Sequence, residues 1–83
     1  MGLIDQCNSV RSREDFVAFA TALAKDFRDN RDSWENASLD RFLEALAGWV
    51  NDMDGHYINK GVSPPQSDWN VLAEMLMAAK MYE

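Results

Sequence analysis

The chain has 83 residues, of which 47% are hydrophobic and 27% charged, a balance typical of a folded globular protein and not of a disordered tail. At this length we expect one domain with a modest core and no room for a large internal cavity. The formal net charge of −6 argues against a nucleic-acid partner, because the phosphates would be repelled.

The acidic surplus is concentrated in the middle of the chain. Residues 12–31 hold four acids and four bases, whereas residues 32–59 hold six acids and one base, Arg41. An acidic surface suits a basic protein partner. A solvated helix face that only maintains solubility would carry the same charges, so both interpretations stay open.

Cysteine usage and the amino terminus favour a cytoplasmic protein. The single Cys7 permits no internal disulfide, as expected in a reducing compartment. The first ten residues lack the basic start and apolar run of a secretory signal. No apolar stretch approaches the ~20 residues of a membrane helix, so no membrane partner is expected.

Residues 1–11 show no helical period, and we expect a loosely ordered lead-in there. From Ser12 the pattern becomes helical: Ser12 is a good N-cap, and Asp15 occupies the third helical position, where an acid is favourable. This helix should end near Asn30. Its apolar residues recur every three or four positions and are Phe16, Phe19, Ala20, Leu23, Ala24 and Phe27.

A second, longer helix is predicted after a short bridge of residues 31–37, in which Ser33 begins a single turn. Ser38 should cap the helix, which continues in phase through Gly55, although a kink or early stop at Gly55 stays open. Its apolar residues fall within a sector of about 120°. They are Leu39, Phe42, Leu43, Leu46, Trp49, Val50, Met53 and Tyr57.

A third helix is predicted after Gly61 and the Pro64-Pro65 pair, with Ser67 or Asp68 as its cap. The predicted fold class is all-α: a small three-helix bundle, or four if the short turn counts, formed by residues 12–83 as one helical domain. The expected core is Phe16, Phe19, Leu23, Phe27, Phe42, Leu46, Trp49, Met53, Leu72, Met75 and Leu76.

No set of residues forms a recognisable reaction centre. His56 is the only histidine, and a calcium loop with Gly55 in sixth place would put Val50 first and Gly61 twelfth, where Glu is needed. We therefore expect no catalytic residue, no metal and no cofactor. An enzymatic alternative would require a pocket that unites His56 with Asp52 and Tyr57.

The polar face of the second predicted helix lies nearly opposite its apolar stripe. It carries Asp40 and Glu44 toward one end, and Gly48, Asn51 and Gly55 further along. The acids would suit a basic partner. The two glycines would let a second copy approach closely, so a homodimer is the structural alternative.

The signatures Trp34-Glu35-Asn36, Gly55-His56-Tyr57-Ile58-Asn59 and Tyr82-Glu83 resemble those of a family of small, acidic, helical bacterial proteins of unknown function. The resemblance runs from about Val10 to the end. It implies a bacterial origin and a compact helical fold, and it implies no activity.

The predicted function is that of a non-enzymatic protein-binding module. A concrete version is an immunity protein or antitoxin for a basic partner, and the alternative is a self-associating homodimer without a toxin. The residues expected to contact the partner lie in and before the second predicted helix. They are Trp34, Glu35, Asn36, Asp40, Glu44, Gly48, Asn51, Asp52, Gly55 and Asn59.

Overall fold

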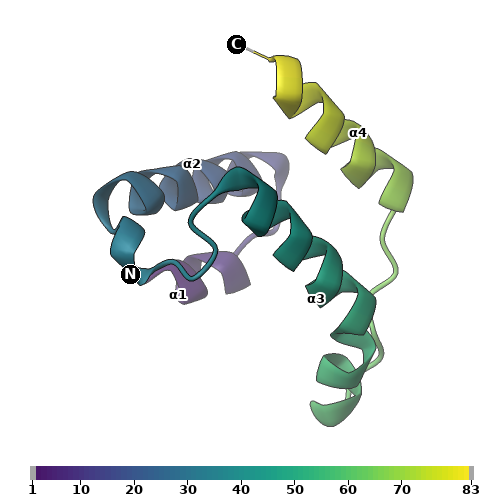
Figure 1. Cartoon of the computed structure of the whole chain (residues 1–83). Coiled ribbons are helices and arrows are strands. Elements are labelled where there is room, and N and C mark those ends of the chain that lie inside the picture. Colours follow the sequence, from purple (N-terminus) through teal and green to yellow (C-terminus); the bar gives the residue numbers. More distant parts are fainter. Residues whose placement is uncertain (1, 83) are drawn as a thin grey trace. The chain divides into compact units, whose positions relative to one another are not determined.

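The computed structural model describes residues 2–82, and Figure 1 shows their helices in chain order. The elements are α1 (Leu3–Asn8), α2 (Arg13–Asp29), the 3-10 turn η1 (Arg31–Ser33), α3 (Leu39–Asn59) and α4 (Trp69–Met81). No strand occurs in this part of the chain. The prediction of an all-α fold is confirmed. Glu83, the last residue of the terminal signature, lies outside the described residues.

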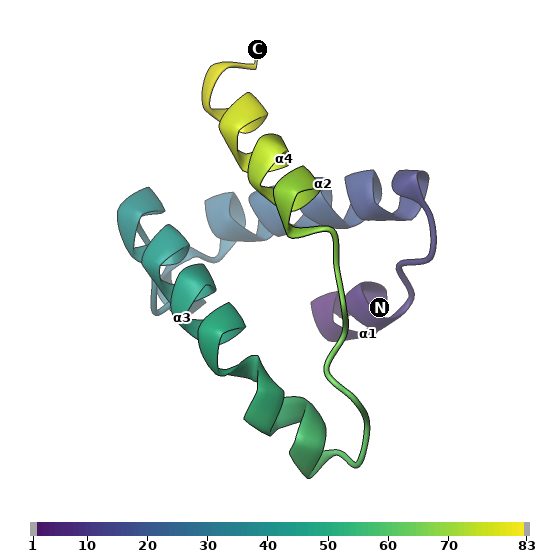
Figure 2. The ribbon, with the colours of Figure 1, turned by 90° about the vertical axis from the view of Figure 1, so that its right-hand side faces the viewer.

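Helix α1 occupies part of the lead-in, where the sequence pattern predicts no helix. It spans six residues, fewer than two turns, so an apolar period has no length over which to appear. The Ser9 hydroxyl donates a hydrogen bond of 2.9 Å to the Asp5 carbonyl oxygen at its end. Helix α1 contacts α2, and both are seen in Figure 2.

Helix α2 begins and ends where the sequence predicts. The Ser12 hydroxyl accepts a hydrogen bond of 3.0 Å from the Asp15 amide, and the Asp15 carboxylate accepts one of 3.0 Å from the Arg11 amide. At the other end the Asn30 amide donates to the Asp26 carbonyl oxygen at 2.7 Å. The Ser12 bond satisfies a backbone donor of the first turn that the helix itself leaves unpaired, and the Asn30 bond satisfies a carbonyl oxygen of the last turn.

Helix α3 runs through Gly55 without interruption, as predicted. It ends in a Schellman motif: the Val62 amide donates to the Tyr57 carbonyl oxygen at 3.1 Å, and the Gly61 amide donates to the Ile58 carbonyl oxygen at 2.9 Å. Gly61 has a φ of 77°, a conformation that glycine adopts without the steric cost of a side chain.

The structure shows which residues cap α3 and α4, for which the sequence predicted Ser38 and either Ser67 or Asp68. The Ser38 carbonyl oxygen accepts the Phe42 amide at 2.9 Å, but its hydroxyl donates to Asp40 and caps no backbone amide. In α4 the cap is Asp68, whose carboxylate accepts the Val71 amide at 3.2 Å. None of the helices between residues 2 and 82 has the length and hydropathy that a membrane span requires.

Contacts divide the chain into two units, the first ending at Gly48 and the second beginning at Trp49, within the continuous helix α3. Met53, 7% exposed, is the only buried residue among those described. Of the other predicted core residues, four are half-buried, namely Phe19, Leu23, Phe27 and Phe42. The remaining six are 38–52% exposed: Phe16, Leu46, Trp49, Leu72, Met75 and Leu76.

The prediction of burial is thus wrong for these six residues. Helical periodicity identifies which face of a helix is apolar, but burial also needs a second element that covers that face. The apolar residues of α4 are the clearest case, because every residue of this helix is exposed.

Candidate functional site

An open groove of about 410 Å³ lies in the first unit, between α2 and the start of α3. Its wall on α2 is built from residues at spacings of three and four, which share one face of the helix. The lining is almost wholly apolar and consists of Ala20, Leu23, Ala24, Phe27, Trp34, Asn36, Ser38, Leu39 and Phe42.

Three aromatic rings form one wall of the groove: Phe27 from α2, Trp34 directly after η1, and Phe42 from α3. The rings of Phe27 and Trp34 are 5.1 Å apart, centre to centre, in an edge-to-face arrangement of 74°. The rings of Trp34 and Phe42 are 6.0 Å apart and tilted by 31°. Such pairs contribute stability beyond the area they bury, so Trp34 joins α2 to α3 through its ring.

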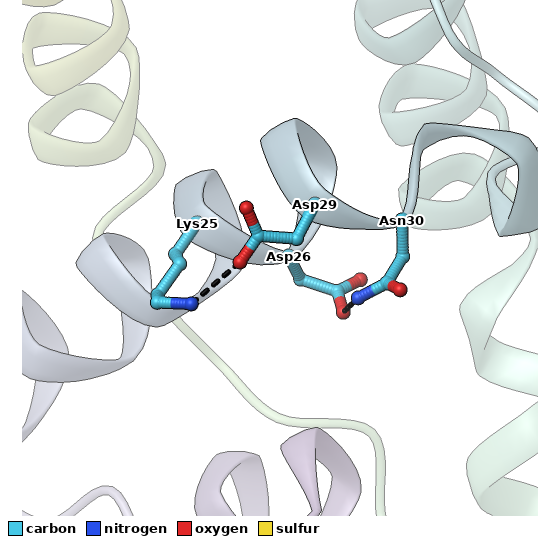
Figure 3. A network of polar contacts seen from close by, with 4 residues as sticks. All are labelled: Lys25, Asp26, Asp29 and Asn30. Carbon is cyan, nitrogen blue, oxygen red and sulfur yellow. Dashed lines mark hydrogen bonds and ion pairs between the residues drawn. The ribbon is translucent and has the colours of Figure 1, made fainter.

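A polar anchor fixes the orientation of the Trp34 ring. Its indole N–H donates a hydrogen bond of 2.8 Å to Oδ2 of Asp26. Oδ1 of the same carboxylate accepts a hydrogen bond of 3.0 Å from the side-chain amide of Asn30, as Figure 3 shows. Both oxygens of Asp26 are therefore engaged, and the carboxylate is held in place at the N–H edge of the indole.

The groove stays open because small residues face it from α2. Ala20 and Ala24 stand one turn apart and carry only a methyl group each. Opposite them Leu39 is 74% exposed, although it lines the groove.

Asp40 holds a fixed negative charge next to the mouth of the groove. Its Oδ1 accepts hydrogen bonds from the Ser38 hydroxyl at 2.6 Å and from the Arg41 amide at 2.9 Å. The Ser38 bond is the larger cause, and the two together lower the pKa of Asp40. The charge therefore persists to more acidic pH than in an ordinary aspartate.

Two basic residues of the first unit also take part in contacts there. The guanidinium carbon of Arg31 is 4.6 Å from the centre of the Phe27 ring, a cation–π contact. Lys25 forms an ion pair with Asp29 one turn further along α2, also drawn in Figure 3. The hydrogen bond from Lys25 lowers the pKa of Asp29.

The structure brings together only some of the residues predicted to bind a partner. Trp34 and Asn36 line the groove, Glu35 stands between them in sequence, and Asp40 is bonded to the lining residue Ser38. Glu44 is exposed on α3 outside the lining.

The other predicted residues lie further along α3. Gly48 ends the first unit, and Asn51, Asp52, Gly55 and Asn59 are exposed in the second unit. A methyl group added at Gly48 or Gly55 would meet no atom within 4 Å apart from those of the adjoining helix backbone, so the surface there is open.

Sequence reasoning missed the groove itself. It placed Leu23, Phe27 and Phe42 in the core, where they instead form an open wall. The available signal was the Ala20–Ala24 pair within an otherwise bulky stripe, since two small residues one turn apart leave a depression.

The residues of the enzymatic alternative do not line this groove. The rings of His56 and Tyr57 meet edge to face with their centres 5.0 Å apart, and Asp52 accepts a hydrogen bond of 3.1 Å from the Asn51 side chain. Between residues 2 and 82, no three side chains of His, Cys, Asp or Glu gather in a way that could hold a metal ion.

The fold and the groove define a small all-α protein with an open apolar groove beside an acidic helix. The chain belongs to the family of unknown function DUF7660, whose model matches residues 12–83. No curated protein and no solved structure matches it. The expected membership of a family of unknown function is confirmed, and the match begins at Ser12, the N-cap of α2.

Proposed function

We propose that this chain is a non-enzymatic protein-binding module whose groove takes apolar side chains from a helix of its partner. The observation that carries the proposal is the open groove of about 410 Å³ walled by Phe27, Trp34 and Phe42. Helices bind grooves of this kind through residues spaced three and four apart. The anchored Trp34 favours binding, because little side-chain freedom remains to be lost.

The partner that best fits the surrounding charge is a basic protein. Residues 32–59 carry six acids against one base, and the two hydrogen bonds to Asp40 favour its charged form. Opposite charge speeds association and excludes acidic competitors. The residues proposed to contact the partner are Trp34, Glu35, Asn36, Asp40, Glu44, Gly48, Asn51, Asp52, Gly55 and Asn59.

The concrete version is a bacterial, cytoplasmic immunity protein or antitoxin. An acidic surface of this kind would cover the cationic cleft of a nuclease toxin and exclude its phosphate substrate. Co-expression with that toxin should then restore growth, and growth arrest despite co-expression would refute this version.

The test is a binding measurement with a matched pair of variants. The native partner is isolated from nuclease-treated lysate, identified, purified and titrated by calorimetry against wild type, Ala24→Trp and Ala18→Trp. Ala24→Trp fills the groove and should weaken binding about tenfold or more. Ala18 lies on an exposed face of α2 outside the lining, so Ala18→Trp should bind like wild type.

Two outcomes contradict the proposal. Equal binding by both tryptophan variants would show that the groove is not the contact site. The role of charge is refuted if the partner is acidic or neutral and its affinity does not change with salt or in the double variant Asp40→Lys with Glu44→Lys.

A homodimer is the second candidate, and α4 favours it. The large apolar residues of this helix are 38–77% exposed: Trp69, Val71, Leu72, Met75, Leu76, Met77 and Met81. A surface this apolar is more often covered than left in water. Sedimentation across a range of concentrations separates the candidates, because a strict monomer would eliminate the dimer.

A further inference from the structure

A second surface, distinct from the groove, lies on the last turns of α3 and is built from aromatic rings. The Trp49 ring is 5.6 Å from the His56 ring and 6.2 Å from the Tyr57 ring, centre to centre. His56 and Tyr57 meet nearly at right angles, at 85°. The three rings support one another, yet Trp49 remains 48% exposed.

An acid stands beside these rings on the same side of the helix. At 100° per residue, Asp52 lies about 60° from Trp49 and about 40° from His56 around the axis. Asp52 is exposed, and its Oδ1 accepts a hydrogen bond from Asn51. Within residues 2–82 it forms no ion pair, and the next lysine or arginine along the chain is Lys60, beyond the end of α3.

An exposed indole next to an unpaired carboxylate is complementary to a cation. The ring face attracts positive charge, and the carboxylate adds a direct ion pair. A guanidinium group fits this combination better than an ammonium group, because it is planar, stacks on an aromatic face and donates two parallel hydrogen bonds to a carboxylate.

We infer that the surface formed by Trp49, Asp52 and His56 binds an arginine side chain of the basic partner. The inference rests on the proposed function, since it assumes that the partner is a basic protein, and it adds a contact outside the groove. Arginine is enriched among the residues that dominate binding energy at protein interfaces. The arginine stacks on the Trp49 indole and pairs with the Asp52 carboxylate, while His56 and Tyr57 hold the indole in position.

The test uses a short peptide of alternating arginine and glycine and its counterpart with citrulline, which has nearly the same shape but no charge. Each peptide is titrated into nitrogen-15-labelled protein at low salt. The arginine peptide should shift the Trp49 indole signal with saturation, and the citrulline peptide should not. An indole signal that stays unmoved by the arginine peptide, or moves equally with both peptides, overturns the inference.

A pair of charge variants separates a local contact from the general field of the acidic chain. Asp52→Asn and Asp54→Asn each remove one negative charge from exposed positions of the same helix, but the two residues point about 200° apart. Asp52→Asn should weaken peptide binding roughly three- to fivefold, and Asp54→Asn much less. If both variants weaken peptide binding equally, the effect comes from the net charge of the chain, and the inference is refuted.

A ring variant tests the aromatic half. Trp49→Leu should weaken peptide binding as much as Asp52→Asn does. Circular dichroism checks that the variant keeps its helix content. The shift of the Trp49 indole signal in the wild type tests the same contact without any substitution. Ala24→Trp should bind the peptide normally. The two statements therefore fail separately. Unchanged peptide binding by Trp49→Leu refutes only this inference, whereas unchanged partner binding by Ala24→Trp refutes the proposed function.

Discussion

The indole N–H of Trp34 donates a hydrogen bond of 2.8 Å to Oδ2 of Asp26, which lies eight positions earlier in the chain, near the end of α2. This bond ties the turn back onto the helix that precedes it. It also sets the position of the ring that contacts both Phe27 and Phe42. The wall of the groove therefore depends on a partly buried polar contact as well as on apolar packing.

Asp26→Ala should lower the free energy of unfolding by about 1–3 kcal/mol, because it removes the acceptor of a partly buried hydrogen bond and leaves the indole N–H unpaired. Urea unfolding followed by circular dichroism measures the change. Asp29→Ala is the control, since Asp29 pairs with Lys25 on the exposed side of the same helix and should matter little. Equal effects of the two variants would contradict the anchoring role of Asp26.

Gly55, inside α3, and Gly61, just after its end, should respond to alanine in opposite directions. Gly61→Ala should destabilise by about 1 kcal/mol, because its φ of 77° strains any side chain. Gly55→Ala should stabilise by up to ~1 kcal/mol, because it removes a flexible residue from a helix interior where the added methyl meets nothing. Thermal unfolding of both variants checks the pair. A loss of stability in Gly55→Ala would contradict the open surroundings of this glycine.

The pKa of Asp40 should rise toward its ordinary value in Ser38→Ala, because the hydroxyl hydrogen bond is the main cause of its depression. A folded-state pKa below the unfolded one contributes stability above the unfolded pKa, and this contribution is lost as pH falls through the folded pKa, below about pH 4. Carbon-detected NMR titration of the carboxyl groups measures the shift.

The crossed control uses the other depressed carboxyl group. Lys25→Met should raise the pKa of Asp29 and leave Asp40 unchanged, while Ser38→Ala should leave Asp29 unchanged. A change at both carboxyl groups in either variant would point to a rearrangement of the first unit instead of a local bond.

The helix boundaries were predictable because capping is a local matter. Ser12, Asp68 and Gly61 each act within about five residues of their own position, and the structure places all three at the predicted helix ends. Continuity through Gly55 was predictable for a related reason: the apolar stripe continues in phase from Trp49 to Tyr57, and the cost of one glycine is small.

The groove was not predictable, because it depends on contacts between residues far apart in the sequence. Phe27 and Phe42 recur at the helical spacing of core residues. They form one wall of the groove because the Trp34 ring contacts both of them. The hydrogen bond between Trp34 and Asp26 has no signature in the sequence, since a turn must first bring the two side chains together.

The reciprocal bonds at the start of α2 determine where the chain can be shortened. The family match begins at Ser12, but the Asp15 carboxylate is bonded to the amide of Arg11, one residue earlier. A fragment that starts at Ser12 would lose that amide and expose a charged amino group where the serine must cap the helix. A fragment that starts at Val10 retains both bonds and is the better boundary for expression.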